Sequence, residues 1–177
     1  EYDTCDCGHI LVIMPFGVKL KILELRGLPG SILVKIVHAY GGILGPAHPY
    51  GEKFMSMIST NERKKKYQQR IAPLLPQFDF VEIFNACESA ETNAKAKRLA
   101  EKFNKPGFGG SDAHRLDCIG KAYTELPDTI RSEDDLIAYV KTCPQIDCGG
   151  EHYNGTDRKR PRLNSSHLTI SYAVFCL

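Results

Sequence analysis

The chain has 177 residues, of which 42% are hydrophobic, and this is enough for one domain with its own apolar core. It has no run of 18 or more apolar residues, so we expect no transmembrane helix and no membrane partner. It opens on Glu1 without the basic and apolar segments of a signal peptide, so we expect a cytoplasmic protein. We expect its seven cysteines to be reduced there.

The net charge of +2 depends on the C-terminal segment, residues 157–177. Without this segment, Lys and Arg fall from 23 to 19 and Asp and Glu from 21 to 20, which leaves a net charge of −1. The blocks "RLNSSH" and "ISYAVFCL" resemble the in-frame translation of a sequencing adapter. We therefore expect a non-native, disordered tail, and the basic charge is no argument for nucleic-acid binding.

Strand-like and helix-like segments alternate through the first half of the chain. The apolar run 9–15 is typical of a buried strand, and 31–40 has the apolar spacing of a helix that ends at two glycines. Residues 43–49 form a short expected strand and turn. The segment 59–75 begins with Ser, Thr and Asn and has a lysine-rich face, which predicts a solvated helix.

The alternation continues in the second half. Residues 78–86 are rich in aromatic and β-branched side chains, as in a strand, and 89–104 have the apolar stripe of a helix. Short strands are expected at 107–114 and 120–126, followed by a capped helix at 132–143. This order predicts an α/β fold with parallel strands.

Polar side chains with metal-binding chemistry fall at the ends of these strands. His48 follows the strand after residue 43, Asn85 closes the next strand, and Asp112 and His114 close the one after it. Alternate side chains of an extended segment share a face, so we expect Asp112 and His114 to point the same way, opposite Ala113. Ligands in α/β folds bind at the carboxyl ends of strands, which makes this edge a candidate metal site.

Three motifs in this order resemble the polymerase and histidinol phosphatase (PHP) family. They are "GGILGPAHPYG" (41–51), "FDFVEIFNA" (78–86) and "GGSDAHRLDCIGKAYTEL" (109–126), and the likeness extends over residues 1–145. The resemblance implies a metal-dependent phosphoesterase on a distorted (β/α)7 barrel. It also implies two or three divalent ions, Mn, Zn or Fe, in the complete protein. The metal ligands that it implies are Glu1, His9, His48, Asp112 and His114.

The sequence also departs from the family pattern. The family has an H-x-H pair on its first strand and a further Asp-His motif soon after it, whereas His9 is the first histidine of this chain. We therefore expect residues 1–156 to be the C-terminal portion of the barrel, with the first strands missing. On this expectation the native product is longer at both ends, and the 177-residue chain hydrolyses phosphoesters poorly or not at all.

The resemblance predicts a reaction as well as a site. Two ions about 4 Å apart lower the pKa of a bound water and hold a phosphate for attack by the resulting hydroxide. Asp112 and His114 would be the catalytic residues, and Asn85 and Arg115 would orient the substrate. The expected substrate is a small phosphorylated metabolite or a nucleotide.

Two other functions remain open on the sequence. The first is a nuclease-like member of the family, for which the near-neutral charge of residues 1–156 gives no support. The second is a metal-binding or regulatory module without turnover, which is consistent with the absence of the H-x-H ligands.

Overall fold

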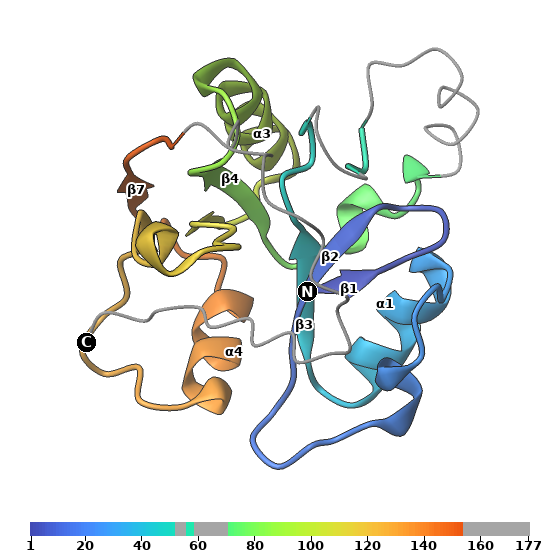
Figure 1. Cartoon of the computed structure of the whole chain (residues 1–177). Helices are drawn as coiled ribbons and strands as arrows, with labels where there is room; N and C mark the ends of the chain where they lie inside the picture. The colour runs from blue at the N-terminus through green and yellow to red at the C-terminus, as the bar shows by residue number, and fades with distance from the viewer. Residues whose placement is uncertain (52–55, 59–70, 154–177) are drawn as a thin grey trace.

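The computed structural model describes residues 1–51, 56–58 and 71–153, which form a mixed α/β fold (Figure 1). Its first sheet has the order β1-β2-β3, with β1 at Tyr2–Asp3, β2 at His9–Ile13 and β3 at Ile43–Pro46. Helix α1, Gly30–Ala39, packs one apolar face against this sheet. The expected strand at 9–15 and the expected helix at 31–40 are therefore present with slightly different bounds.

Strands β2 and β3 are antiparallel, which differs from the parallel pairing predicted from strand–helix alternation. The connection between β2 and α1 runs back to the start of β2, where the Gly27 amide donates to the Asp3 carbonyl oxygen (2.9 Å). Helix α1 then leads the chain to the far end of β2, where Gly42 lies against the Ile13 carbonyl. The chain therefore enters β3 from the far end of β2 and runs antiparallel to it. The alternation of strands and helices in the sequence gives their order but not the direction in which each connection runs.

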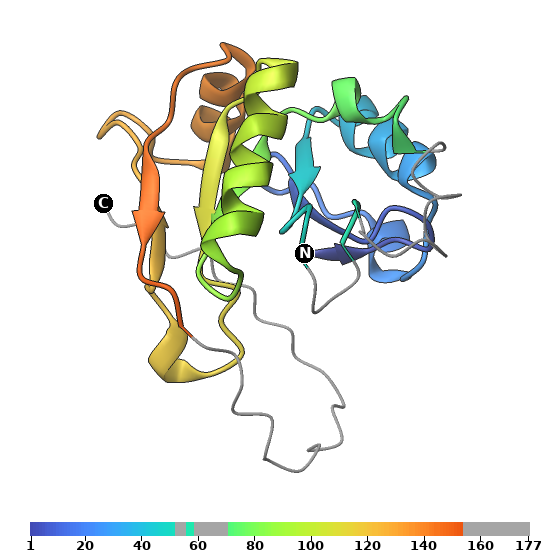
Figure 2. The same cartoon turned by 90° about the horizontal axis from the view of Figure 1, so that it is seen from above.

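The prediction of parallel strands is correct for the next unit. Strand β4 (Val81–Asn85), helix α3 (Ala90–Phe103) and strand β5 (Gly107–Gly110) form a parallel βαβ crossover. The Ser89 hydroxyl caps α3 by accepting from the Thr92 amide (3.2 Å). In Figure 2, α3 lies along one face of these strands.

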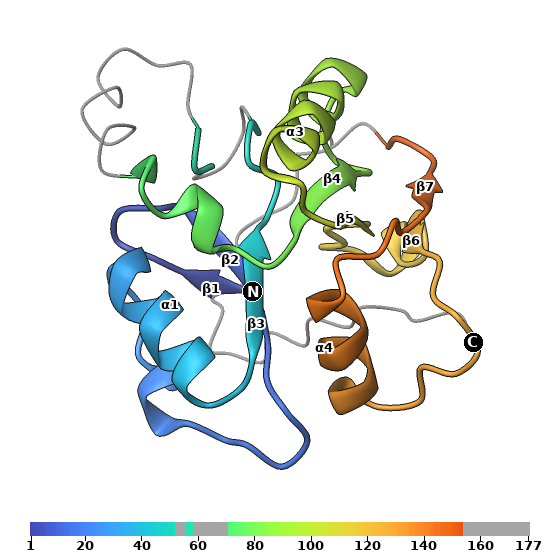
Figure 3. The same cartoon turned by 180° about the vertical axis from the view of Figure 1, so that it is seen from behind.

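The last unit begins with β6 (Ala122–Thr124) and ends with β7 (Cys148–Gly150), joined through α4 (Glu133–Lys141). These two strands pair antiparallel, beside β5 (Figure 3). The Thr124 hydroxyl accepts from the Gly109 amide (2.9 Å) and donates to the Gly109 carbonyl (3.0 Å), and so replaces a ladder contact between β5 and β6.

Three apolar clusters fill the interior of the described residues, and the smallest packs Leu99 and Ala100 of α3 against Val81 of β4. Another lies between α1 and the first sheet and includes Ile10, Leu33 and Val37. The third joins the two halves of the fold, because α4 packs Leu136, Ile137 and Val140 against side chains of β3, β5 and the segment before β4. The side chains that α4 meets there are Ile43, Phe80 and Phe108.

Some predictions fall outside the described residues. Residues 59–70 of the predicted helix at 59–75 are among them, and its described end continues into a 3-10 turn at Leu75–Gln77. The predicted tail, 157–177, also lies outside the described part of the chain. Further 3-10 turns occur at Lys21–Glu24 and Leu116–Cys118. Among the described residues, no helix is both long enough and apolar enough to cross a bilayer.

We predict that Gly109→Ala destabilises the fold by about 1–3 kcal/mol, the usual cost of overpacking. A Cβ at Gly109 would collide with the backbone carbonyl oxygen of Tyr123, which cannot move without shifting β6. Gly149→Ala is a matched control, because its Cβ would lie 3.3 Å from the Tyr123 hydroxyl at the end of a flexible side chain. Equal midpoints of urea unfolding for the two variants would contradict the predicted close approach of β5 and β6.

Candidate metal centre

The antiparallel register of β1 and β2 builds one side of the site. Asp3 lies opposite His9, and Glu1, two residues before Asp3, lies on the same face of the sheet. The Glu1 carboxylate reaches His9 Nδ1 (2.5 Å), and Asp3 Oδ1 lies 3.3 Å from His9 Nε2. Tyr2 and Ile10 point to the opposite face, into the core. Alternation along two short strands therefore separates the polar side of the hairpin from its apolar side.

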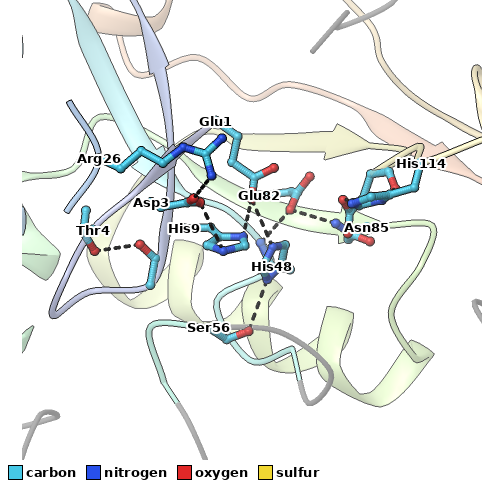
Figure 4. A network of polar contacts seen from close by, with 12 residues as sticks. Glu1, Asp3, Thr4, His9, Arg26, His48, Ser56, Glu82, Asn85 and His114 are labelled. Carbon is cyan, nitrogen blue, oxygen red and sulfur yellow. Dashed lines mark hydrogen bonds and ion pairs between the residues drawn. The ribbon is translucent and has the colours of Figure 1, made fainter. Parts of the chain in front are cut away.

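His48 joins this group from the turn after β3. Its ring meets that of His9 edge to face, with centroids 5.2 Å apart, and its Nε2 lies 3.4 Å from Glu1 Oε1. Its Nδ1 lies 3.2 Å from the Ser56 hydroxyl. Figure 4 shows the carboxylate of Glu1 directed toward both imidazoles. The ligand atoms of Glu1, His9 and His48 all lie within 4.8 Å of one another, as ligands of one metal ion would.

Asp112 and His114 line the same pocket as these three residues, a cleft of about 330 Å³. The segment is not extended as expected, because β5 ends at Gly110 and Asp112 has a left-handed backbone with φ 47°. The Asp112 side chain is only 8% exposed, whereas that of His114 is 72% exposed. A turn, rather than strand alternation, brings both side chains to the pocket.

The Asp112 carboxylate has one buried oxygen, Oδ2, without a hydrogen-bond partner among the described residues. Burial raises the pKa of this carboxyl, and the nearby charge of Glu1 adds to that rise. A buried acceptor that lacks a donor costs free energy unless a cation or water satisfies it. Together with two imidazoles and the Glu1 carboxylate, it forms the mixed nitrogen and oxygen donor set that Mn²⁺, Zn²⁺ and Fe²⁺ accept. The residues present therefore fit a divalent metal.

The charges around His48 support the same conclusion. Burial opposes a charge on its imidazole, yet the carboxylates of Glu1, Glu82 and Asp112 together raise the pKa of His48 to about 9. Burial would likewise raise the pKa of Glu1, but its contacts with His48 and His9 hold that pKa well below its usual range. A proton on His48 thus balances the surrounding carboxylates, and a metal ion would take over that role.

Glu82 has a central position that the sequence analysis did not assign. It is buried at the second residue of β4, and its Oε2 accepts from the His48 amide (2.6 Å) and from Asn85 Nδ2 (3.1 Å). Burial raises its pKa to about 7. A signal was present, because a charged residue inside the apolar run "FVEIF" has to find a buried partner.

The two residues predicted to orient substrate do not line the cleft in the described part of the chain. Asn85 is 1% exposed, and its side chain donates to Glu82 and accepts from the Cys87 amide (2.9 Å), so it supports the residues around the site. Arg115 extends along the surface to form an ion pair with Asp117, with Nε 2.9 Å from Oδ1.

Comparisons with known proteins relate part of the chain to a protein family. Residues 90–142, which include Asp112 and His114, match a family model described as PHP-associated. This match supports a relationship of the chain to the PHP family. The match begins at α3, so Glu1, His9 and His48 lie outside the matched region.

Two individual proteins are similar to parts of the chain. An uncharacterised protein of Methanocaldococcus jannaschii is 43% identical over 58 residues, which are 32% of this chain and 24% of that protein. The crystal structure of PsfC from Pseudomonas syringae PB-5123 is similar in fold, with a TM-score of 0.56 and 19% identity. That likeness covers 84% of this chain and 57% of PsfC. The chain therefore spans only part of the length of each.

We predict that Mn²⁺ or Zn²⁺ stabilises the chain and that His9→Ala removes the effect. Metal at about 100 times its dissociation constant should add about 2.7 kcal/mol to the free energy of unfolding. The gain should be smaller at pH 6 than at pH 8, because metal must displace the His48 proton, whose pKa is about 9.

His38→Ala provides the control for this measurement. His38 belongs to α1, forms a hydrogen-bonded pair with Asp79 (2.9 Å) and does not line the cleft. Thermal unfolding with and without metal should show full stabilisation of this variant. Equal metal stabilisation of the His9→Ala chain would remove His9 from the ligand set.

Proposed function

We propose that this chain is part of a metal-dependent phosphoesterase that hydrolyses a small phosphorylated metabolite or a nucleotide. One observation supports this most strongly. The ligand atoms of Glu1, His9 and His48 lie within 4.8 Å of one another, beside the cleft that also receives the buried carboxylate of Asp112. Such a cluster is suited to hard and borderline divalent ions, and the PHP-family relationship adds the reaction class.

Each group has a specific task in this proposal. The divalent ions, when bound, would polarise the phosphate and supply a hydroxide at neutral pH. Glu1, His9 and His48 hold the ligand geometry from one side of the cleft, and Asp112 and His114 complete it from the other. Asp3 orients the His9 ring through its second nitrogen, which is the usual task of a carboxylate behind a metal-binding histidine.

The proposal also includes a fold and a cellular compartment. We propose that the described strands form the C-terminal portion of a distorted (β/α)7 barrel. The parallel β4–α3–β5 unit and the PHP-associated match support this. The substrate would be a small phosphorylated molecule in the cytoplasm. Arg115 would have to leave its ion pair with Asp117 to orient that substrate, and Asn85 would act through Glu82.

A non-catalytic metal-binding module is the second candidate. It is favoured by the description of the matching model, which is PHP-associated, and by the position of His114, whose ring projects largely into solvent. Such a module would bind metal through Glu1, His9 and His48 without positioning a phosphate. Binding of phosphate to the metal-loaded chain therefore separates the two candidates.

The test measures orthophosphate affinity by calorimetry, with the chain loaded with Mn²⁺ and with the metal-free chain. Phosphate should bind only the loaded chain, and Asp112→Asn should weaken that binding by about 10- to 100-fold, as expected for a lost group of a metal site. Asp128→Asn is the matched control, because Asp128 is an exposed carboxylate that does not line the cleft. The phosphate affinity of this variant should equal that of the unmodified chain.

Turnover is the second readout. A chain that also contains the family's H-x-H ligands should hydrolyse p-nitrophenyl phosphate with Mn²⁺ orders of magnitude faster than the 177-residue chain, because catalysis needs ligands held within about 0.5 Å of the productive geometry. Metal binding with neither phosphate affinity nor turnover would overturn the phosphoesterase proposal and leave the non-catalytic module.

A further inference from the structure

Tyr153 reaches the site from the segment after β7. Its hydroxyl lies 2.7 Å from the carbonyl oxygen of Ser111 and 2.7 Å from that of Asp112, and its amide donates to the Ala86 carbonyl (2.9 Å). The ring of its neighbour His152 packs at a tilt against Phe84 of β4, with ring centroids 5.0 Å apart. The end of the described chain therefore packs against the end of β4. From there the Tyr153 phenol is directed at the turn after β5.

The turn that Tyr153 contacts has a further side-chain contact within the described residues, since His114 Nδ1 lies 2.9 Å from the Asp112 carbonyl oxygen. Strand β5 ends at Gly110, whose carbonyl accepts from the Ala86 amide (3.0 Å), and the strand ladder does not extend to Ser111 or Asp112. Asp112 also adopts φ 47°, a left-handed conformation that residues with a Cβ adopt only as isolated cases. A part-buried carbonyl is stabilised by a donor, and a hydroxyl shared between two successive carbonyls favours the left-handed turn over the extended backbone.

The backbone conformation of this turn determines where the Asp112 carboxylate lies. With this backbone, the side chain is directed inward beside His48, and its Oδ2 remains available to a cation. In an extended backbone, Asp112 would follow the alternation of β5 instead. We propose that Tyr153 is a positioning residue, which acts through the Ser111 and Asp112 carbonyls to hold the Asp112 carboxylate in the metal-binding cleft.

A phenol suits this role, because its O–H is a hydrogen-bond donor and its rigid ring fixes where that donor lies. Segments distant in sequence, from β4 to Tyr153, thus contribute to one metal site.

The experiment compares Tyr153→Phe with Tyr123→Phe in the 177-residue chain. Both changes remove only a hydroxyl, and the Tyr123 phenol lies against Gly149 in β6–β7, outside the cleft. The first readout is the ¹³C chemical shift of the Ser111 and Asp112 carbonyls, which reports a lost hydrogen bond directly. The second is the affinity for Co²⁺, followed by its visible absorption. Tyr153→Phe should move both carbonyl shifts and weaken Co²⁺ binding by about tenfold, the lower limit for a lost supporting group.

The two readouts separate this inference from the proposed function, on which its metal-binding part rests. Unchanged carbonyl shifts in Tyr153→Phe would overturn the inference, as would equal Co²⁺ affinity in the two variants. If the unmodified chain bound no Co²⁺, the proposed function would fail, and the carbonyl shifts would still decide whether Tyr153 holds the turn. Shifts that move equally in Tyr123→Phe would show a general change of structure and would also overturn it.

Discussion

The buried carboxylate of Glu82 is the interaction on which the geometry of the site depends. It accepts from the His48 amide after β3 and from the Asn85 side chain at the end of β4, and Gly110 of β5 lies so close that a Cβ would collide with Oε1. One side chain therefore fixes the ends of three strands relative to one another. Burying a carboxylate is costly, and the rise of its pKa to about 7 reflects that cost. The hydrogen bonds from the His48 amide and the Asn85 side chain offset part of this cost, and the positive charge of His48 opposes the rise of the Glu82 pKa.

This arrangement explains why unusual backbone conformations gather at the strand ends. His48 has φ 29° and Asp112 has φ 47°, and both follow strands that Glu82 holds in place. Such conformations persist only where the surrounding contacts fix them, and they are common at binding sites. Here the contacts are the Glu82 carboxylate on one side and the Tyr153 hydroxyl on the other. Both direct polar side chains into one cleft.

The sequence alone predicts the parts of this structure that local patterns determine. Strand β2, helix α3 and the parallel pairing of β4 with β5 follow from apolar periodicity, capping residues and turn residues. The residues Glu1, His9, His48, Asp112 and His114 were expected in one site, and all five line the same cleft. Their metal ligation stays a prediction, since proximity alone does not establish it.

Other features depend on contacts that no local pattern contains. The reversal of β3 depends on the path of residues 14–29, and the left-handed turn at Asp112 depends on a tyrosine that lies 41 positions further along the chain. Asn85 lies at the end of a strand, where the sequence predicted a contact with substrate. It is instead buried, and its side chain donates a hydrogen bond to Glu82. Glu82 itself was visible as a charge inside an apolar strand, and its partner amide could be identified only in three dimensions.

The most direct measurement is anomalous diffraction from crystals grown with Zn²⁺ and collected at the zinc edge. We predict an anomalous peak in the cleft, within about 2.0–2.2 Å of a nitrogen of His9, a nitrogen of His48 and an oxygen of Glu1. Absence of a peak there, in crystals that contain zinc bound elsewhere on the chain, would contradict the claim that these strand ends form a metal centre.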